Sequence, residues 1–404
     1  MELTVAAIFA VVYLGMFLGG IPGLGLDRTG VALLGAIALV AAGRITIENI
    51  WTAVDTSTIA LLFSLMIVSA QFRLSGSYSY LVRRVGAIPL PPWKMLGLVI
   101  AVTGCLLAVL ANDIVCLAVA PVLIEVCSRR GFNPLPFLLG LACASNVGSA
   151  ATLIGNPQNM LIGQVLGISF LEYMADALVP SVAGLGLVWA VITLVFRRRW
   201  YRLIEIPRVE TPVYNRWQTA KGMVVLGVLI LFFLFLPVRR DIVALAAAGV
   251  LMLSRRMRTR EILSLVDWHL LVLFISLFVV NHCLRASGLF DQLLAGLTGR
   301  GIDLGQPEPL FAVSALLSNL VSNVPAVMLL LPATAHPQSA PILALSSTLA
   351  GNLLIVGSIA NIIVVEQAAW LGVDISWREH ARVGIPITLL TLAAAAGWLW
   401  LVSP

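Results

Sequence analysis

About ten apolar stretches of this chain approach the length that crosses a lipid bilayer. A hydrocarbon core of about 30 Å requires about 20 apolar residues of helix. Because lipid offers no hydrogen bonds to the backbone, a chain of this kind crosses as helices. We therefore expect crossings in ten segments: 3–25, 29–46, 56–74, 134–166, 176–196, 219–237, 241–254, 266–286, 340–369 and 384–402.

Composition supports an all-α polytopic membrane protein. Charged residues make up 11% of the chain and apolar residues 60%, whereas soluble domains carry about 25% charged residues. The net charge of +6 comes from basic residues at the ends of apolar stretches, which indicates topology and not a nucleic-acid partner. The first stretch lacks a basic leader and a cleavage site, so we expect a retained helix. The lipid bilayer of the inner (plasma) membrane is the expected environment.

The two halves of the chain repeat one another. The window 54–76 matches 266–288 at 9 of 23 positions, and 141–162 aligns with 343–364. Self-similarity of this kind indicates that one supersecondary unit occurs twice. We predict three parts: a first repeat at 1–196, a cytoplasmic linker at 197–220 and a second repeat at 221–404.

The two repeats are expected to have inverted topology. Each has five crossings plus one ambiguous segment, and an odd number of crossings turns the second copy upside down. With the Arg-rich stretch 197–208 in the cytoplasm, 20 of the 25 basic residues lie at inside ends. This agrees with the positive-inside rule and places both termini outside.

Two ambiguous segments, 93–128 and 308–332, fit re-entrant helix hairpins. The first is basic at both ends, so it would enter and leave on the cytoplasmic side, with Asn112 and Asp113 at its tip. The second has Asn323 in the equivalent place and would enter from outside. The alternative is a pair of ordinary short helices joined by a surface turn.

Helix breakers interrupt two apolar stretches, 134–166 and 340–369. Gly148, Gly155 and Pro157 favour unwound backbone in the first, although a single glycine such as Gly148 can equally serve close packing. Unwound backbone in a bilayer lines a cavity or is buried in protein, and matching breaks in inverted halves indicate a transporter's substrate site. We predict binding through the breaks and both hairpin tips, by Asn112, Ser145, Asn146, Thr152, Asn156, Asn159, Ser322, Asn323, Ser347, Thr348, Asn352, Ser358 and Asn361.

Asp113 is the only acid deep in the first hairpin. An ionisable group inside a membrane costs about 2.5–3.5 kcal/mol on insertion scales, which makes it a functional candidate. We expect it to couple transport by binding a proton or a cation. The alternative is a cap that accepts backbone N–H groups. No cofactor is expected apart from a sodium ion, for which the candidate positions are Asn112, Asn146, Asn323 and Asn352.

Three cysteines keep another hypothesis open. Cys105 and Cys116 flank the first tip, and Cys143 precedes the first break. Soft thiolate ligands suit a trivalent arsenic solute. Buried packing cysteines are the alternative.

Four motifs, in order, resemble the ion transporter superfamily, which includes arsenite permeases, sodium-coupled dicarboxylate symporters, silicic-acid efflux transporters and some sodium/proton antiporters. They are "LANDIVCLAVAP", "ASNVGSAATLIGNPQNMLIG", "SNLVSNVPAVMLLLP" and "LALSSTLAGNLLIVGSIANIIVVEQ". The resemblance covers nearly the whole chain. It implies a scaffold domain and a transport domain in each protomer, usually in a homodimer.

The hairpin tips place the chain within that superfamily. The dicarboxylate branch carries Ser-Asn-Thr at each tip, whereas this chain has Ala111-Asn112-Asp113 and Ser322-Asn323-Val324. The first tip looks like that of arsenite permeases, and the stretches behind the tips resemble the anion-permease branch, to which silicic-acid exporters are similar. The resemblance therefore implies an anion or weak-acid solute without fixing which.

Taken together, these features predict a secondary active transporter of a small anion or weak-acid oxyanion, driven by a proton or sodium gradient through alternating access. The sequence has no P-loop for nucleotide and no His-rich or paired-carboxylate cluster for an enzyme. A sodium/proton antiporter that uses Asp113 is the main alternative, and a channel is another.

Overall fold

The computed structural model describes residues 2–21, 23–203, 209–334 and 336–402. Part of the predicted linker, residues 204–208, lies outside the described residues. The described chain is predominantly helical, in line with the predicted class. Its only strands are β1 (Gly20–Ile21) and β2 (Leu26–Asp27), an antiparallel pair in which Gly20 faces Asp27.

The helices of the first half, in chain order, are α1 (Glu2–Leu18), α2 (Arg28–Ala41), α3 (Ile50–Ala53), α4 (Thr56–Leu74), α5 (Ser77–Ala87), α6 (Pro92–Leu107), α7 (Asn112–Arg129), α8 (Pro134–Ser149), α9 (Pro157–Val165) and α10 (Phe170–Phe196). Those of the second half are α11 (Arg216–Phe235), α12 (Arg240–Met252), α13 (Thr259–Leu263), α14 (Trp268–Ala286), α15 (Leu289–Thr298), α16 (Pro307–Val321), α17 (Asn323–Leu330), α18 (Ser339–Ala350), α19 (Ile359–Trp370) and α20 (Trp377–Val402), with short 3₁₀ turns at Leu331–Ala333 and Ile355–Gly357.

Five described helices are long and apolar enough to cross a membrane: α4, α10, α11, α14 and α20. Eight further apolar helices are shorter. The chain is thus a multi-pass membrane protein, as its apolar stretches predict.

Several predicted boundaries were wrong for local reasons. The first stretch was expected to run to residue 25, but α1 ends at Leu18 because Gly19 takes φ +80°. The crossing expected at 176–196 begins earlier, at Phe170, where Ser169 and Glu172 form a reciprocal capping box. The polar residues in the first turn of α10 hid its start from a hydropathy reading.

The repeated sequence positions have structural roles. Asp55 and Asp267 cap α4 and α14, accepting the backbone N–H of the third residue on at 2.7 and 2.9 Å. Gly76 and Gly288 end those helices at φ +70° and +75°, a left-handed conformation that favours glycine. Each glycine is followed by a short amphipathic helix, α5 or α15, which hydropathy alone did not predict.

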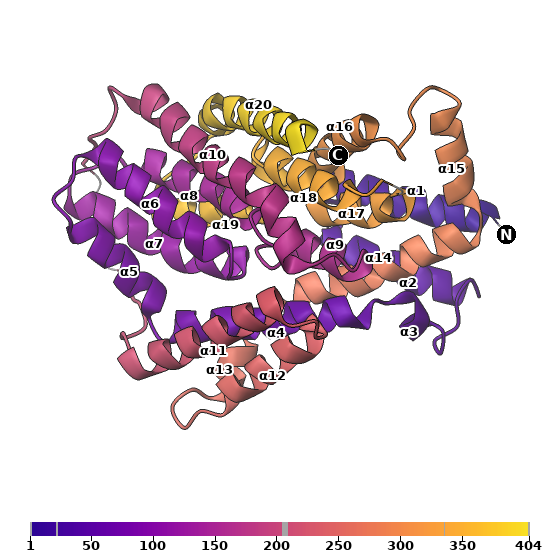
Figure 1. Cartoon of the computed structure of the whole chain (residues 1–404), viewed down its shortest axis with the longest axis horizontal. Coiled ribbons are helices and arrows are strands. Elements are labelled where there is room, and N and C mark those ends of the chain that lie inside the picture. Colours follow the sequence, from indigo (N-terminus) through magenta and orange to yellow (C-terminus); the bar gives the residue numbers. More distant parts are fainter. Residues whose placement is uncertain (1, 22, 204–208, 335, 403–404) are drawn as a thin grey trace.

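Helices from the two halves pack directly on one another. α10 lies against α20, α4 against α12, α2 against α14 and α7 against α19. In Figure 1, α10 and α20 lie together along one edge, while α5 and α15 lie at opposite ends of the long axis. The interrupted helices α8, α9, α18 and α19 occupy the middle of this arrangement.

Candidate functional site

The segments predicted to be interrupted are interrupted in the structure. In the first half, residues 108–111 separate α6 from α7, and residues 150–156 separate α8 from α9. In the second half, Ser322 alone separates α16 from α17, and residues 351–358 separate α18 from α19. Four interruptions are therefore present, two in each half.

The ends of these elements meet around one small cavity of about 30 Å³. A buried water molecule needs roughly 10–15 Å³ of such space, so the cavity holds only a few atoms in this conformation. We call it the central cavity. Its lining residues are Asn112, Asp113, Pro157, Gln158, Leu270, Ser322, Asn323, Val324, Ser358 and Ile359.

Four helices begin at the central cavity. Asn112 is the first residue of α7, Pro157 of α9, Asn323 of α17 and Ile359 of α19, and all four line it. The first turn of a helix leaves backbone N–H groups without intrahelical partners, and the helix dipole adds positive potential there. Such ends attract anions. The described lining contains no Lys or Arg and a single acid, Asp113.

An amide network behind the cavity joins the two breaks. Asn146 donates to the side-chain oxygens of Asn352 at 2.8 Å and Asn361 at 3.2 Å, and it accepts from Ser358 Oγ at 2.8 Å. Asn361 also donates to the carbonyl of Gly351 at 2.8 Å. All four side chains are at least 95% buried. Asn146 of the first half thus hydrogen-bonds side chains in and beside the interruption of the second half.

A second network supports the first break. Asn156 caps α9 by accepting the backbone N–H of Asn159 at 2.9 Å. Asn159 Nδ2 donates to the carbonyl of Thr152 and to Tyr173 Oη, both at 3.0 Å. Gln158 Nε2 reaches across to Thr348 Oγ1 at 3.1 Å. The unwound carbonyls are therefore satisfied by amide side chains, as buried polar groups require.

The predicted site residues divide into three groups by position. Asn112, Asp113, Ser322, Asn323 and Ser358 line the central cavity. The networks behind it contain Asn146, Asn156, Asn159, Thr348, Asn352 and Asn361. Three others lie apart from the lining: Thr152, whose hydroxyl bonds the Ala108 carbonyl, Ser347, which bonds its own helix, and Ser145, which lies beside Cys116.

The second hairpin tip is strained and holds an unpaired polar atom. Ser322 adopts φ +78°, ψ +159°, and it is the only non-glycine residue with positive φ in the described chain. This region is essentially restricted to glycine and costs about 1–3 kcal/mol. Beside it, Asn323 Oδ1 is buried without a hydrogen-bond partner, as is Asn352 Nδ2 in the second break. Unpaired buried groups and strain of this kind cluster at ligand sites.

Close approach at two glycines fixes how the elements meet. A Cβ at Gly351 would lie 3.2 Å from Asn323 Nδ2, so the second tip rests on the second break. A Cβ at Gly148 would lie 2.7 Å from the backbone of Gly104, which brings α8 against α6. The packing role considered for Gly148 is the one observed.

Asp113 does not cap its helix. Its backbone N–H donates to Asn112 Oδ1 at 3.1 Å, and no backbone N–H within the described chain donates to its carboxylate. Asp267, the cap of α14, is near enough to interact with it electrostatically. The acid therefore lines the central cavity, and no Lys, Arg or His of the described residues forms an ion pair with it.

The three cysteines do not form a thiol site. Among the described residues no group of three His, Cys, Asp or Glu side chains is placed to hold a metal. Cys105 is exposed on α6, whereas Cys116 and Cys143 are buried. Packing is the role that the structure supports for Cys116 and Cys143.

Several residues of the site were not singled out from the sequence, among them the apolar Val324 and Ile359 of the lining. Gln158 lies in the first polar stretch but was passed over, although it lines the cavity and bridges to Thr348. Nothing in the sequence distinguishes Leu270 as a lining residue, because it is one of many apolar residues in the apolar helix α14. Asp267 was noticed only as the position of the repeat that matches Asp55, and nothing in the sequence indicated that it caps α14.

Comparison with known proteins identifies relatives along nearly the whole chain. An uncharacterized transporter of Mycobacterium tuberculosis is 32% identical over 405 residues, covering 93% of this chain and 94% of the relative. A silicon efflux transporter of Oryza sativa subsp. japonica is 26% identical over 468 residues, covering 95% of each. The crystal structure of the Alcanivorax borkumensis YdaH transporter matches with a TM-score of 0.58 at 14% identity, covering 99% of this chain and 98% of that one.

These relatives are transporters and not enzymes, and they place the chain in the anion-permease branch of the ion transporter superfamily that its motifs resemble. The solved structure shares the fold alone at that level of identity. The citrate transporter family model matches residues 7–341, and the chain therefore belongs to this family of membrane transporters.

Proposed function

We propose that the chain is a secondary active transporter of a small anion or weak-acid oxyanion, driven by a proton or sodium gradient. The observation that carries this proposal is the meeting of four helix N-termini at the central cavity. Their dipoles supply positive potential without a basic side chain, so an anion or a hydrogen-bonding neutral acid is favoured there.

The size of the central cavity favours a compact solute. At about 30 Å³ it holds a few atoms, whereas citrate has thirteen heavy atoms of roughly the size of water oxygens and needs a wider conformation. Silicate, arsenite, phosphate and sulfate have only four or five heavy atoms, so the cavity would have to widen much less for them. The amide and hydroxyl groups of Asn112, Ser322 and Asn323 would bind the oxygens of such a solute.

Alternating access through two inverted repeats is the proposed mechanism. Supporting it, each half has two interruptions in the same order, and the predicted hairpin tips, at Asn112 and at Ser322 and Asn323, line one cavity. If one hairpin enters from each side of the membrane, each would close the cavity from its own side. A sodium ion, if coupled, would bind near Asn112 and Asn323 in the lining, or near Asn146 and Asn352 in the network.

A panel of solutes tests the proposal directly. The purified protein in liposomes would be assayed for uptake and efflux of silicate, arsenite, phosphate, sulfate, citrate and dicarboxylates, each with an imposed sodium or proton gradient. We expect saturable movement of at least one solute that depends on one of the two gradients. Flux that does not saturate and ignores both gradients would instead indicate a channel.

Asp113→Asn tests coupling. The Asp113 carboxylate is the only acid in the described lining. Replacing it by an amide should abolish the dependence of transport on the ion gradient, while solute binding persists. Glu366→Gln on the exposed side of α19 is the matched control and should transport normally. Full gradient-driven transport by Asp113→Asn would refute the coupling role.

A sodium/proton antiporter is the second candidate, favoured by Asp113 as the single acid in the described lining of the central cavity. An ionisable group of this kind inside a membrane is a candidate for binding a proton or a cation. Sodium-driven proton flux in liposomes without any added anion would support the antiporter, and its absence would favour solute transport. A homodimer and an inner-membrane location, implied by the resemblance, stay predictions.

A further inference from the structure

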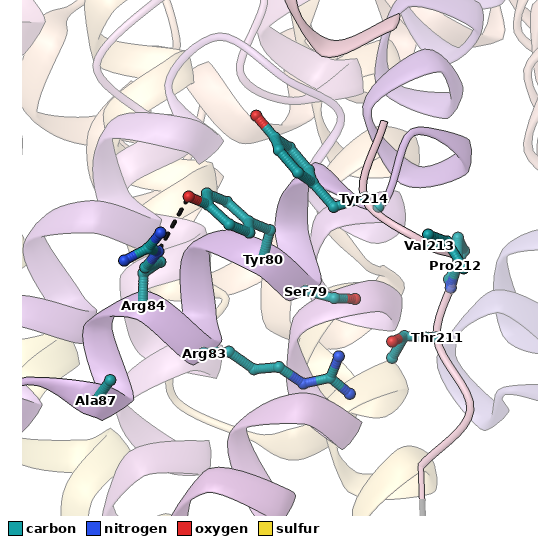
Figure 2. A pocket seen from close by; sticks show the side chains of 10 residues that line it. Ser79, Tyr80, Arg83, Arg84, Ala87, Thr211, Pro212, Val213 and Tyr214 are labelled. Carbon is teal, nitrogen blue, oxygen red and sulfur yellow. Dashed lines mark hydrogen bonds between the residues drawn. The ribbon is translucent and has the colours of Figure 1, made fainter. Parts of the chain in front are cut away.

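A second cavity, of about 590 Å³, lies between α5 and the segment that joins the two halves. We call it the linker cavity. Among the described residues its lining is Gly76, Ser79, Tyr80, Arg83, Arg84, Ala87 and residues 211–214, none of which is an acid. Figure 2 shows Arg83 extending from α5 toward Thr211, with Ser79 beside it.

Several contacts hold the linker wall in place. The backbone N–H of Asn215 donates to the Ser75 carbonyl at 2.8 Å. The rings of Tyr80 and Tyr214 stack with centroids 4.0 Å apart. Pro212 packs so closely that its carbonyl oxygen would be 2.6 Å from a Cβ at Gly76. The cavity is therefore bounded by fixed protein on both sides.

Hydrogen-bond donors in the linker cavity remain free. Arg83 uses one nitrogen on Glu125 at 2.9 Å, and Arg84 uses Nε on Tyr80 Oη at 3.0 Å. A guanidinium has five N–H donors, so most of theirs are available. Ser79 also lines the cavity, and its hydroxyl can donate to a ligand there.

We propose that the linker cavity binds the phosphate of an anionic phospholipid headgroup. Guanidinium groups and hydroxyls that line the same cavity can donate to the oxygens of a phosphate. Ala87, Pro212 and Val213 provide an apolar wall for the glycerol end of a lipid. Arg83 and Arg84 belong to the basic end of the protein that is predicted to face the cytoplasm, where anionic lipids recruit Lys and Arg.

This inference is independent of the transported solute, since it concerns the joint between the two halves. A bound headgroup would bridge α5 to residues 211–214 and so restrain the linker. The source of the phosphate separates two cases: a membrane lipid, to which the proposal commits, or a soluble phosphate.

Binding of dioctanoyl phosphatidylglycerol to the full chain in neutral detergent tests the proposal, measured by calorimetry with dioctanoyl phosphatidylcholine as the reference lipid. We expect saturable binding of phosphatidylglycerol alone. Arg84→Gln should weaken it by about tenfold, the scale of one charge-assisted contact. Ser79→Ala should weaken it less. Lys94→Gln removes an exposed charge that is not part of the lining and should leave binding unchanged.

Folding of each variant is checked by its melting temperature without lipid, and Arg83 is left intact because it pairs with the buried Glu125. Equal binding of both lipids, or binding unaffected by Arg84→Gln and Ser79→Ala in folded protein, would overturn the proposal. Displacement of phosphatidylglycerol by millimolar inorganic phosphate would overturn the lipid source and assign the same cavity to a soluble phosphate.

Discussion

At the scale of single residues, the asparagines have different tasks. Asn112 and Asn323 line the central cavity. The amide of Asn146 instead makes hydrogen bonds with residues of the second half. The sequence could not separate these roles, because an asparagine that binds solute and one that holds unwound backbone have the same side chain. Only the direction of each amide distinguishes them.

Asn146→Ala should destabilise the protein. It removes three hydrogen bonds between the halves and leaves Ser358 and Asn352 without those partners. Each buried unsatisfied group costs about 1–3 kcal/mol. The melting temperature in detergent should fall clearly below that of Ser346→Ala, which loses a buried bond within its own helix. Equal melting temperatures of the two variants would show that the network contributes little.

Ser322→Gly should stabilise the protein. Glycine adopts φ +78° freely, so about 1–3 kcal/mol of backbone strain is relieved, against about 0.5–1 kcal/mol for the entropy of glycine. Ser322→Ala keeps the strain and loses the same hydroxyl. We therefore expect the glycine variant to melt above the alanine variant. If the hydroxyl binds solute, both variants should transport less well.

At the scale of elements, the interruptions were the most predictable feature. Gly and Pro cannot continue a helix without cost, so the breaks at 150–156 and 351–358 follow from composition. The short helices α5 and α15 were missed because they are amphipathic and lack the long apolar run that identifies a crossing. In the sequence, Gly76 and Gly288 were noticed only as matching positions of the repeat, and their left-handed conformation was not predicted.

Gly148→Ala should separate α8 from α6. The new Cβ would lie 2.7 Å from the Gly104 backbone, which has no side chain that could move aside. Overpacking of this kind costs about 1–3 kcal/mol. Gly186→Ala in α10 is the control, since nothing lies within 4 Å of its Cβ, and it should be neutral or slightly stabilising. Equal stability of both variants would mean that the two helices can shift apart at no cost.

At the scale of the whole molecule, helices of both halves pack on one another, so neither half is expected to be stable alone. The order of elements recurs, and the loops after α5 and α15 occupy equivalent positions. The inverted topology predicts that these loops face opposite sides of the membrane. From the distribution of basic residues, the positive-inside rule predicts that the loop after α5 lies in the cytoplasm.

Cysteine labelling tests this orientation. Ile88→Cys and Ile302→Cys place thiols at exposed, equivalent positions, in a background where the exposed Cys105 is replaced by serine. A membrane-impermeant maleimide applied to intact cells should label position 302 at once and position 88 only after permeabilisation. Labelling of both from the same side would refute the inverted topology.

The sequence by itself determined that this chain is a membrane protein, that its two halves share a repeated sequence pattern, and where its helices are interrupted. Those properties are local: they depend on apolar run length, on Gly and Pro, and on spacing along the chain. Which polar groups share a cavity was decided only by the tertiary structure. Asp113 and Ser358 meet there from 245 positions apart in the chain, because contacts between distant segments depend on how whole helices pack, and periodicity carries no record of that.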